Sequence, residues 1–140
     1  MTGYLLDTNV VSEMTKTKRN QNVKSWLDSQ RASDLFISEH TVGELYKGVF
    51  HLPPSQRRIQ VENWLEKSVI PMFDGRVLPI NFRSWVVWGK LCGEALRRGR
   101  PLPMVDAVLA ATAMEHKLTL ATRDKALISL GVAVVNPWQA

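Results

Sequence analysis

The stretch Tyr4-Leu5-Leu6-Asp7-Thr8-Asn9 joins a short apolar run to an acidic residue and two polar turn residues. The apolar run is typical of a buried strand, and the polar triplet is typical of the turn that ends one. A helix is expected to begin within residues 9–13. Because the strand passes directly into a helix, this stretch indicates the opening unit of an α/β fold.

The rest of the chain repeats this alternation. Further strands are expected at residues 35–38, 77–80, 118–121 and 132–135. Helices are expected at residues 22–29, 41–50, 55–67, 82–98 and 105–115, with a short one at 125–130. Short β-rich runs separated by helices predict an α/β sandwich with a mainly parallel central sheet. No repeat, low-complexity tract or linker interrupts the 140 residues, so we expect a single domain over residues 1–140.

Four acidic residues stand at the ends of these expected elements: Asp7, Glu44, Asp106 and Asp124. Asp7 and Asp124 directly follow strands, and in parallel α/β folds ligands bind beyond the carboxyl ends of the strands. Carboxylates that gather in one place repel each other unless a hard cation neutralises them. In a chain with a net charge of +5, such a set suggests a metal site that acts on phosphate.

Three of these acids also have a purely structural interpretation. Asp7 suits an Asx-turn or a helix cap, and Asp124 suits a cap for the short helix at 125–130. Asp106 follows Pro103 in the first turn of a helix, where the helix dipole favours a carboxylate. These interpretations leave unexplained why four acids stand at the mouths of adjacent elements of one α/β layer.

Glu44 has the sharpest structural alternative. The sequence Thr41-Val42-Gly43-Glu44 matches a capping box, in which the glutamate bonds back to the start of its helix. Ser38 is a competing N-cap, which would place Glu44 deeper in the helix and leave its carboxylate free. Both choices stay open in the sequence.

The basic residues form three groups: Lys16, Lys18 and Arg19; Arg57 and Arg58; and Arg97, Arg98 and Arg100. Solvated helix ends and loops explain any one group. Three groups in a chain of 140 residues make contact with a phosphate backbone a reasonable expectation.

Several other kinds of protein are excluded. No window has the unbroken apolar length of a membrane span, and the N-terminus lacks the regions of a signal peptide. Cys92 is the single cysteine, so no intrachain disulfide is expected. His40, His51 and His116 are too scattered for a histidine metal site, and no glycine-rich phosphate loop is present. We therefore expect a cytoplasmic protein with no membrane partner.

Five motifs, taken in order, resemble those of PIN-domain proteins. They resemble more narrowly the VapC-type toxins of type II toxin–antitoxin pairs, including the FitB-like branch. The motifs are LLDTNVVSE (5–13), TVGELYKG (41–48), DAVLAATA (106–113), ATRD (121–124) and VNPW (135–138). Because the resemblance runs from Tyr4 to Trp138, it covers essentially the full chain.

This resemblance implies a three-layer α/β/α PIN-like fold and a Mg²⁺- or Mn²⁺-dependent endoribonuclease. The enzyme would hydrolyse RNA phosphodiester bonds and leave a 5′-phosphate and a 3′-hydroxyl. Asp7 and Asp106 would bind the metal directly, whereas Glu44 and Asp124 would bind it directly or through water. By the same resemblance, Asn9 would orient Asp7, and Thr122 would supply a hydroxyl beside the site.

The resemblance also implies partners. These are a cognate antitoxin that covers the acidic site, a second copy of the chain in a homodimer, and DNA only through the antitoxin. The helix at 55–67 and the one bearing Trp85 and Trp88 would supply such surfaces. The candidates for holding the RNA backbone are Lys16, Arg97, Arg98 and Arg100.

Two other functions compete with this one. The first is a weakly active or non-catalytic PIN-domain partner that binds an antitoxin in a promoter-binding regulatory complex. A phosphatase of the haloacid dehalogenase type also places an aspartate after its first strand. That chemistry wants a second aspartate two positions after Asp7, where this chain has Asn9, and a positioned lysine that the sequence does not identify.

Overall fold

The computed structural model describes residues 3–140, apart from the side chain of Ser129, and within this range one five-stranded sheet has the order β3-β2-β1-β4-β5. The strands are β1 (Tyr4–Leu6), β2 (Leu35–Ser38), β3 (Val77–Leu78), β4 (Thr119–Ala121) and β5 (Val134–Val135). Each of the four strand pairings in the described range is parallel. The parallel sheet expected from the sequence is therefore confirmed.

Six α-helices connect these strands in the described part of the chain: α1 (Thr8–Met14), α2 (Gln21–Ser29), α3 (Glu39–His51), α4 (Gln56–Trp64), α5 (Phe82–Arg97) and α6 (Met104–Glu115). Shorter helical turns are η1 (Ala32–Asp34), η2 (Leu65–Val69), η3 (Ile70–Phe73) and η4 (Lys125–Leu130). Of these, η2 is a π-helical turn. Helix thus alternates with strand along the chain, as an α/β fold requires.

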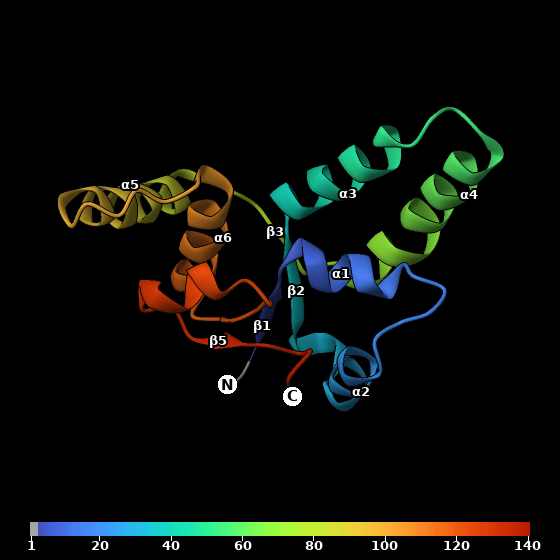
Figure 1. Cartoon of the computed structure of the whole chain (residues 1–140), viewed down its shortest axis with the longest axis horizontal. Coiled ribbons are helices and arrows are strands. Elements are labelled where there is room, and N and C mark those ends of the chain that lie inside the picture. The colour runs from blue at the N-terminus through green and yellow to red at the C-terminus, as the bar shows by residue number, and fades with distance from the viewer. Residues whose placement is uncertain (1–2) are drawn as a thin grey trace.

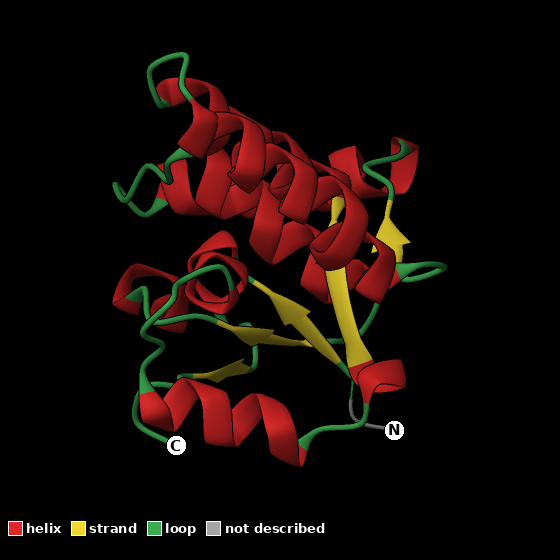
Figure 2. Ribbon diagram, turned by 90° about the vertical axis from the view of Figure 1, so that its right-hand side faces the viewer, coloured by secondary structure: helices red, strands yellow, loops and turns green. Residues whose placement is uncertain are grey.

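The two sides of the sheet carry different helices. Leu6 packs in a cluster with residues of α1, α2 and α3, whereas Leu5 packs in a second cluster with residues of α6 and η4. Successive residues of a strand point to opposite faces, so these two fully buried leucines join the sheet to both helical layers. Figure 1 shows α1, α3 and α4 on one side and α5 and α6 on the other, and Figure 2 shows the strands between helical layers. The three-layer α/β/α expectation is confirmed.

Several element boundaries differ from those expected. The strand expected at 77–80 ends at Leu78, because Pro79 has no N–H for the ladder. The strands expected at 118–121 and 132–135 begin later, at Thr119 and Val134. The helix expected at 55–67 is regular only to Trp64 and then continues as η2 and η3, where Pro71 cannot donate an α-helical hydrogen bond.

Helix α6 is the most deeply buried helical segment of the layer that covers Leu5. Every residue of its stretch 107–113 is buried, as its run of apolar and small residues predicts. Asp106, in the first turn, directly precedes this buried stretch and is itself half-buried. No helix within residues 3–140 is long and apolar enough to cross a membrane.

Candidate active site

The four acids predicted to form a site approach one another from four different elements. Asp7 directly follows β1, Asp124 precedes η4 after β4, Glu44 lies on α3, and Asp106 lies in the first turn of α6. The charges of Asp124, Asp7 and Glu44 all act on the Asp106 carboxyl and raise its pKa. The fold therefore gathers all four carboxylates into one electrostatic neighbourhood.

Asp7 is held by two hydrogen bonds. Its Oδ1 accepts from the backbone N–H of Thr8 at 2.7 Å, and its Oδ2 accepts from the hydroxyl of Thr122 at 2.6 Å. Burial raises the pKa of Asp7 and is the largest influence, while these two hydrogen bonds lower it. The negative charges of Glu44 and Asp124 raise the pKa further. A nearby cation would relieve both the desolvation and the repulsion.

Asp106 lacks such compensation. Burial is the main cause that raises its pKa, followed by the charges of Asp124, Asp7 and Glu44 and by a hydrogen bond with the Asp124 carboxyl. Every one of these influences disfavours the ionised form. If Asp106 served only to interact with the helix dipole, its ionised form would be favoured. The raised pKa therefore does not fit a purely structural role.

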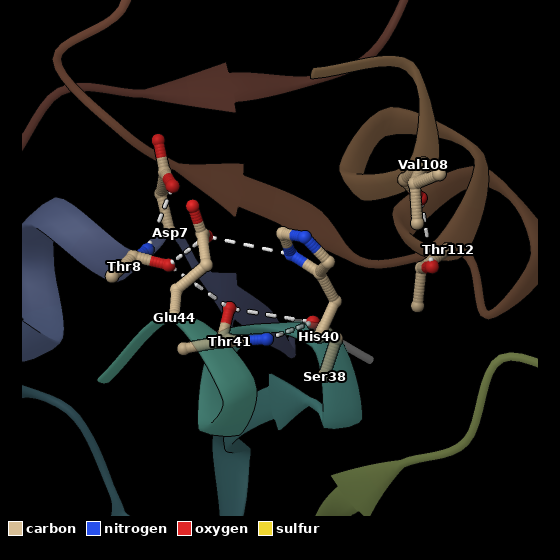
Figure 3. Close-up of polar contacts among 8 residues, drawn as sticks. All are labelled: Asp7, Thr8, Ser38, His40, Thr41, Glu44, Val108 and Thr112. Atoms are coloured by element: carbon tan, nitrogen blue, oxygen red, sulfur yellow. Dashed lines mark hydrogen bonds and ion pairs between the residues drawn. The ribbon is translucent and has the colours of Figure 1, made fainter. Parts of the chain in front are cut away.

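The structure decides between the two caps that the sequence leaves open for α3. Ser38 is the N-cap, because its Oγ accepts from the backbone N–H of Thr41 at 3.1 Å. The capping box that begins at Thr41 is wrong, since the helix starts at Glu39 and Glu44 lies in its second turn. Glu44 Oε1 instead accepts from the Thr8 hydroxyl at 2.5 Å, and Nδ1 of His40 lies 3.4 Å from the same oxygen. Figure 3 shows that Thr8 contacts both acids, with its backbone N–H donating to Asp7 and its hydroxyl to Glu44.

Thr122 connects the remaining residues that the resemblance singles out. Its Oγ1 accepts from the backbone N–H of Asp124 at 3.0 Å and from Nδ2 of Asn9 at 3.5 Å while donating to Asp7. Asn9 thus reaches Asp7 through Thr122, and Oδ1 of Asn9 is buried without a hydrogen-bond partner among residues 3–140. Asp124 Oδ1 also accepts from the N–H of Ala126 at 2.9 Å, so its predicted cap is formed alongside its place in the acidic set.

A chain of hydroxyl groups at this site was not found from the sequence. Thr8 Oγ1 lies 3.3 Å from Thr41 Oγ1, which lies 3.3 Å from Oγ of Ser38. This chain runs from the end of β2 to Glu44 (Figure 3). The available signal was the position of Thr8 directly after Asp7, in a turn where a small hydroxyl side chain reaches a neighbouring element.

The oxygen atoms that the four acids offer are of the type that binds a hard divalent cation. All four candidates offer carboxylate oxygens, the ligands that Mg²⁺ and Mn²⁺ favour. Within residues 3–140, however, no three His, Cys, Asp or Glu side chains are already close enough together to hold one ion. Mg²⁺ keeps several of its waters in protein sites, so one or two direct carboxylates with others acting through water suit it.

The predicted backbone-binding residues do not gather at one place. Lys16 lies in the loop after α1 and forms a 3.0 Å ion pair with Glu13. Arg97 and Arg98, at the end of α5, lie 2.5 Å and 3.5 Å from Oε1 of Glu94. The loop after α1 and helix α5 lie on opposite sides of the molecule in Figure 1. Arg100 lines a hollow together with Arg98 on the α5 side.

The chain is similar to known proteins over nearly its full length. Residues 4–132 match the family model described as PIN domain. The chain is 38% identical to Toxin FitB of Neisseria gonorrhoeae over 135 residues, which cover 96% of this chain and 97% of FitB. It is 36% identical to VapC ribonuclease Y4jK of Sinorhizobium fredii over 136 residues, covering 96% of this chain and 97% of that protein. The solved structure of FitAB bound to an IR36 DNA fragment contains a chain with a TM-score of 0.91 and 36% identity, with 96% of this chain and 95% of that chain covered.

Proposed function

The chain belongs to the PIN-domain family and, within it, to the FitB- and VapC-type toxins, and from this premise we propose that it is a metal-dependent endoribonuclease. Its proposed reaction is the hydrolysis of RNA phosphodiester bonds, held in check by a cognate antitoxin. The observation that carries the proposal is that the fold brings the four acids close together. The charges of Asp124, Asp7 and Glu44 raise the pKa of Asp106. We take residues 1–140 as one domain that works in the cytoplasm.

The four acids have different proposed roles. Asp7 and Asp106 are proposed to bind Mg²⁺ or Mn²⁺ directly, because burial raises the pKa of both carboxyls and a bound cation would lower it. Glu44 and Asp124 are proposed to bind directly or through water. The ion, when bound, supplies a more acidic water and neutralises charge on the phosphoryl oxygens.

Three uncharged side chains are proposed to position these acids. The Thr122 hydroxyl fixes one oxygen of Asp7 at 2.6 Å, and the Thr8 hydroxyl fixes one oxygen of Glu44 at 2.5 Å. Each leaves the second oxygen of the carboxylate, or its second lone pair, for another ligand. Asn9 supports Asp7 through Thr122, whose Oγ1 lies 3.5 Å from Nδ2 of Asn9. Lys16, Arg97, Arg98 and Arg100 remain the proposed contacts to the RNA backbone.

The experiment that tests this function uses the purified chain freed of antitoxin. We expect it to cut single-stranded RNA with Mg²⁺ or Mn²⁺, and we expect EDTA to stop the reaction. Asp7→Asn removes charge but little volume, so it is expected to abolish cleavage and leave the fold intact. Asp74→Asn, at an exposed aspartate in the turn after η3, is the matched control and keeps full activity. Cleavage by Asp7→Asn at the wild-type rate would contradict the assignment.

Partners are proposed on two surfaces. For a homodimer, α5 exposes apolar side chains that include Phe82 (81% exposed) and Trp85 (43% exposed). For the antitoxin, a hollow of about 200 Å³ lies between α3 and α4, is lined by Leu45 and Val61, and reaches Glu44. A segment seated there would also cover part of the acidic site. Any DNA contact is proposed to be made through the antitoxin; the related FitAB complex was solved bound to a DNA fragment.

The DNA-bound FitAB relative also supports a second candidate, a weakly active or non-catalytic partner in a promoter-binding complex. The assay of antitoxin-free protein separates the two. Metal-dependent cleavage lost in Asp7→Asn supports the enzyme, whereas no cleavage together with promoter binding by the complex supports the regulatory partner. The haloacid dehalogenase alternative is wrong, because the chain matches the PIN-domain family over residues 4–132.

A further inference from the structure

We propose that a basic hollow at the end of α1, outside the acidic site, binds a single-stranded stretch of the RNA substrate; this inference rests on the proposed ribonuclease function. The hollow has a volume of about 560 Å³. Its charged lining residues are Lys16, Lys18, Arg19 and Lys24, and among the described residues that line it there is no aspartate or glutamate. A concave surface with only positive charge attracts a phosphate backbone.

Two of these four cations form no ion pair within residues 3–140. Lys16 is paired with Glu13 at 3.0 Å, and Lys24 is paired with Asp28 at 2.8 Å. Lys18 and Arg19 are exposed, and neither forms an ion pair with any residue in the range 3–140. These two side chains are therefore the ones whose charge an RNA phosphate would neutralise.

The basic loop is held in shape by a buried carboxylate. Glu13 is only 4% exposed, and its Oε2 accepts from the backbone N–H of Asn20 at 2.8 Å while Oε1 contacts Lys16. The Asn20 side chain in turn caps α2, accepting from the N–H groups of Asn22 and Val23. Both ends of the loop at 16–20 are thus fixed before any ligand arrives. Preorganisation of this kind reduces the entropy lost on binding.

The hollow is linked to the acidic site by residues that line neighbouring hollows. Thr15 lines both the basic hollow and the neighbouring hollow between α3 and α4, and that second hollow also reaches Glu44. Glu44 in turn lines a third hollow together with Thr8. A single strand of RNA lying along α1 would pass from the acidic site, through these neighbouring hollows, to the cations. Arg97 and Arg98 lie on the α5 side, away from this path (Figure 1).

The tryptophan in the lining of the hollow favours single-stranded RNA over a duplex. Trp64, at the end of α4, lines the basic hollow and is partly buried against the core. Unpaired bases stack on such side chains, whereas the bases of a duplex are stacked on each other. Single-stranded RNA would therefore suit the hollow, with its phosphates at Lys18 and Arg19 and one base stacked on Trp64.

Binding to the basic hollow is tested apart from cleavage. In the Asp7→Asn background without metal, affinity for a labelled single-stranded RNA is measured over a range of salt concentrations. For Lys18→Gln combined with Arg19→Gln, we expect the slope of log affinity against log salt to fall by about 1.4, at about 0.7 for each phosphate that the protein no longer neutralises. The charge-matched control combines Lys90→Gln with Lys117→Gln, exposed residues outside the path, and keeps the parent slope.

A second pair of variants tests the stacking role of Trp64. Trp64→Leu is expected to weaken single-stranded RNA binding on the order of tenfold, while Trp64→Phe retains a stacking face and most of the affinity. An unchanged salt slope in the Lys18 and Arg19 variant overturns the inference. So does an unchanged slope accompanied by loss of copurification with the antitoxin, which would assign the hollow to that protein. If the wild type does not cut RNA, the proposed function fails whatever these binding measurements give.

Discussion

Thr122 at the end of β4 donates a 2.6 Å hydrogen bond to Asp7 at the end of β1, across 115 positions of sequence. The parallel register causes this contact. Leu6 pairs with Ala121, and the backbone N–H of Asp7 donates to the carbonyl of Ala121 at 2.9 Å. Asp7 and Thr122 directly follow this pair, so the pairing of the two strands places the hydroxyl beside the carboxylate.

We expect Thr122→Val to lower RNA cleavage by about 10- to 100-fold, the usual effect of removing a group that orients a metal-binding side chain. The loss of a hydrogen bond to a charged group would also lower the free energy of unfolding by about 1.5–3 kcal/mol. Thr122→Ser keeps the hydroxyl and is expected to keep activity. Equal activity in the valine and serine variants would mean that the hydroxyl does not position Asp7.

The pH dependence of stability tests the crowding of acids. The pKa of Asp7 is raised above its ordinary value of 3.8, chiefly by burial. Between that value and the raised pKa, the folded state binds more protons than the unfolded chain, so this group costs stability as the pH rises. Without metal, Asp7→Asn is therefore expected to unfold at a higher temperature than the wild type at pH 7. We expect the difference to shrink toward pH 4, and a variant less stable at pH 7 would contradict this.

Metal binding is expected to reverse that order. An ion that binds only the folded state stabilises it by about 2.7 kcal/mol at a concentration 100 times its dissociation constant. Adding Mn²⁺ or Mg²⁺ should raise the unfolding temperature of the wild type, and EDTA should remove the gain. In the variant that combines Asp7→Asn with Asp106→Asn, the ion is expected to have no effect. An equal gain in wild type and variant would place the ion elsewhere.

The N-cap of α3 is tested by Ser38→Ala. Loss of this cap typically costs about 1 kcal/mol, which for a domain of this size lowers the unfolding temperature by about 4 °C. Ser38→Thr keeps the hydroxyl that accepts from the N–H of Thr41 and is expected to retain more stability than Ser38→Ala. The comparison is made by thermal unfolding. An unchanged unfolding temperature in Ser38→Ala would contradict its role as the cap.

Glu13 is expected to stabilise the loop after α1 in the opposite sense to Asp7. The backbone N–H of Asn20, then Lys16, hold its pKa below the ordinary value of 4.5. Its contribution is present above that value and is lost as the pH falls through the lowered pKa. Glu13→Gln should be less stable than the wild type at pH 7, with the difference vanishing in acid. Glu66→Gln, at an exposed position in η2, serves as the control.

Local pattern predicted most of the elements, because each depends on neighbours in the chain. The apolar run before Asp7 and the small, apolar stretch of α6 both fold as expected. Boundaries failed where a proline interrupted hydrogen bonding, as at Pro79. The burial of Glu13 was not visible, because its partners lie in a loop whose path the sequence does not specify.

For the site, the sequence by itself determined which acids end which elements, and the ordered motifs identified the family to which they belong. It did not determine how those ends meet. The sheet order β3-β2-β1-β4-β5 makes β4 a neighbour of β1 and so joins Thr122 and Asn9 to Asp7. The choice between Ser38 and Thr41 as the cap was also tertiary, since either hydroxyl suits a cap locally and the Thr8 hydroxyl on α1 binds the freed Glu44. Propensity and turn chemistry act between near neighbours, whereas these contacts follow from strand pairing and helix packing over long separations.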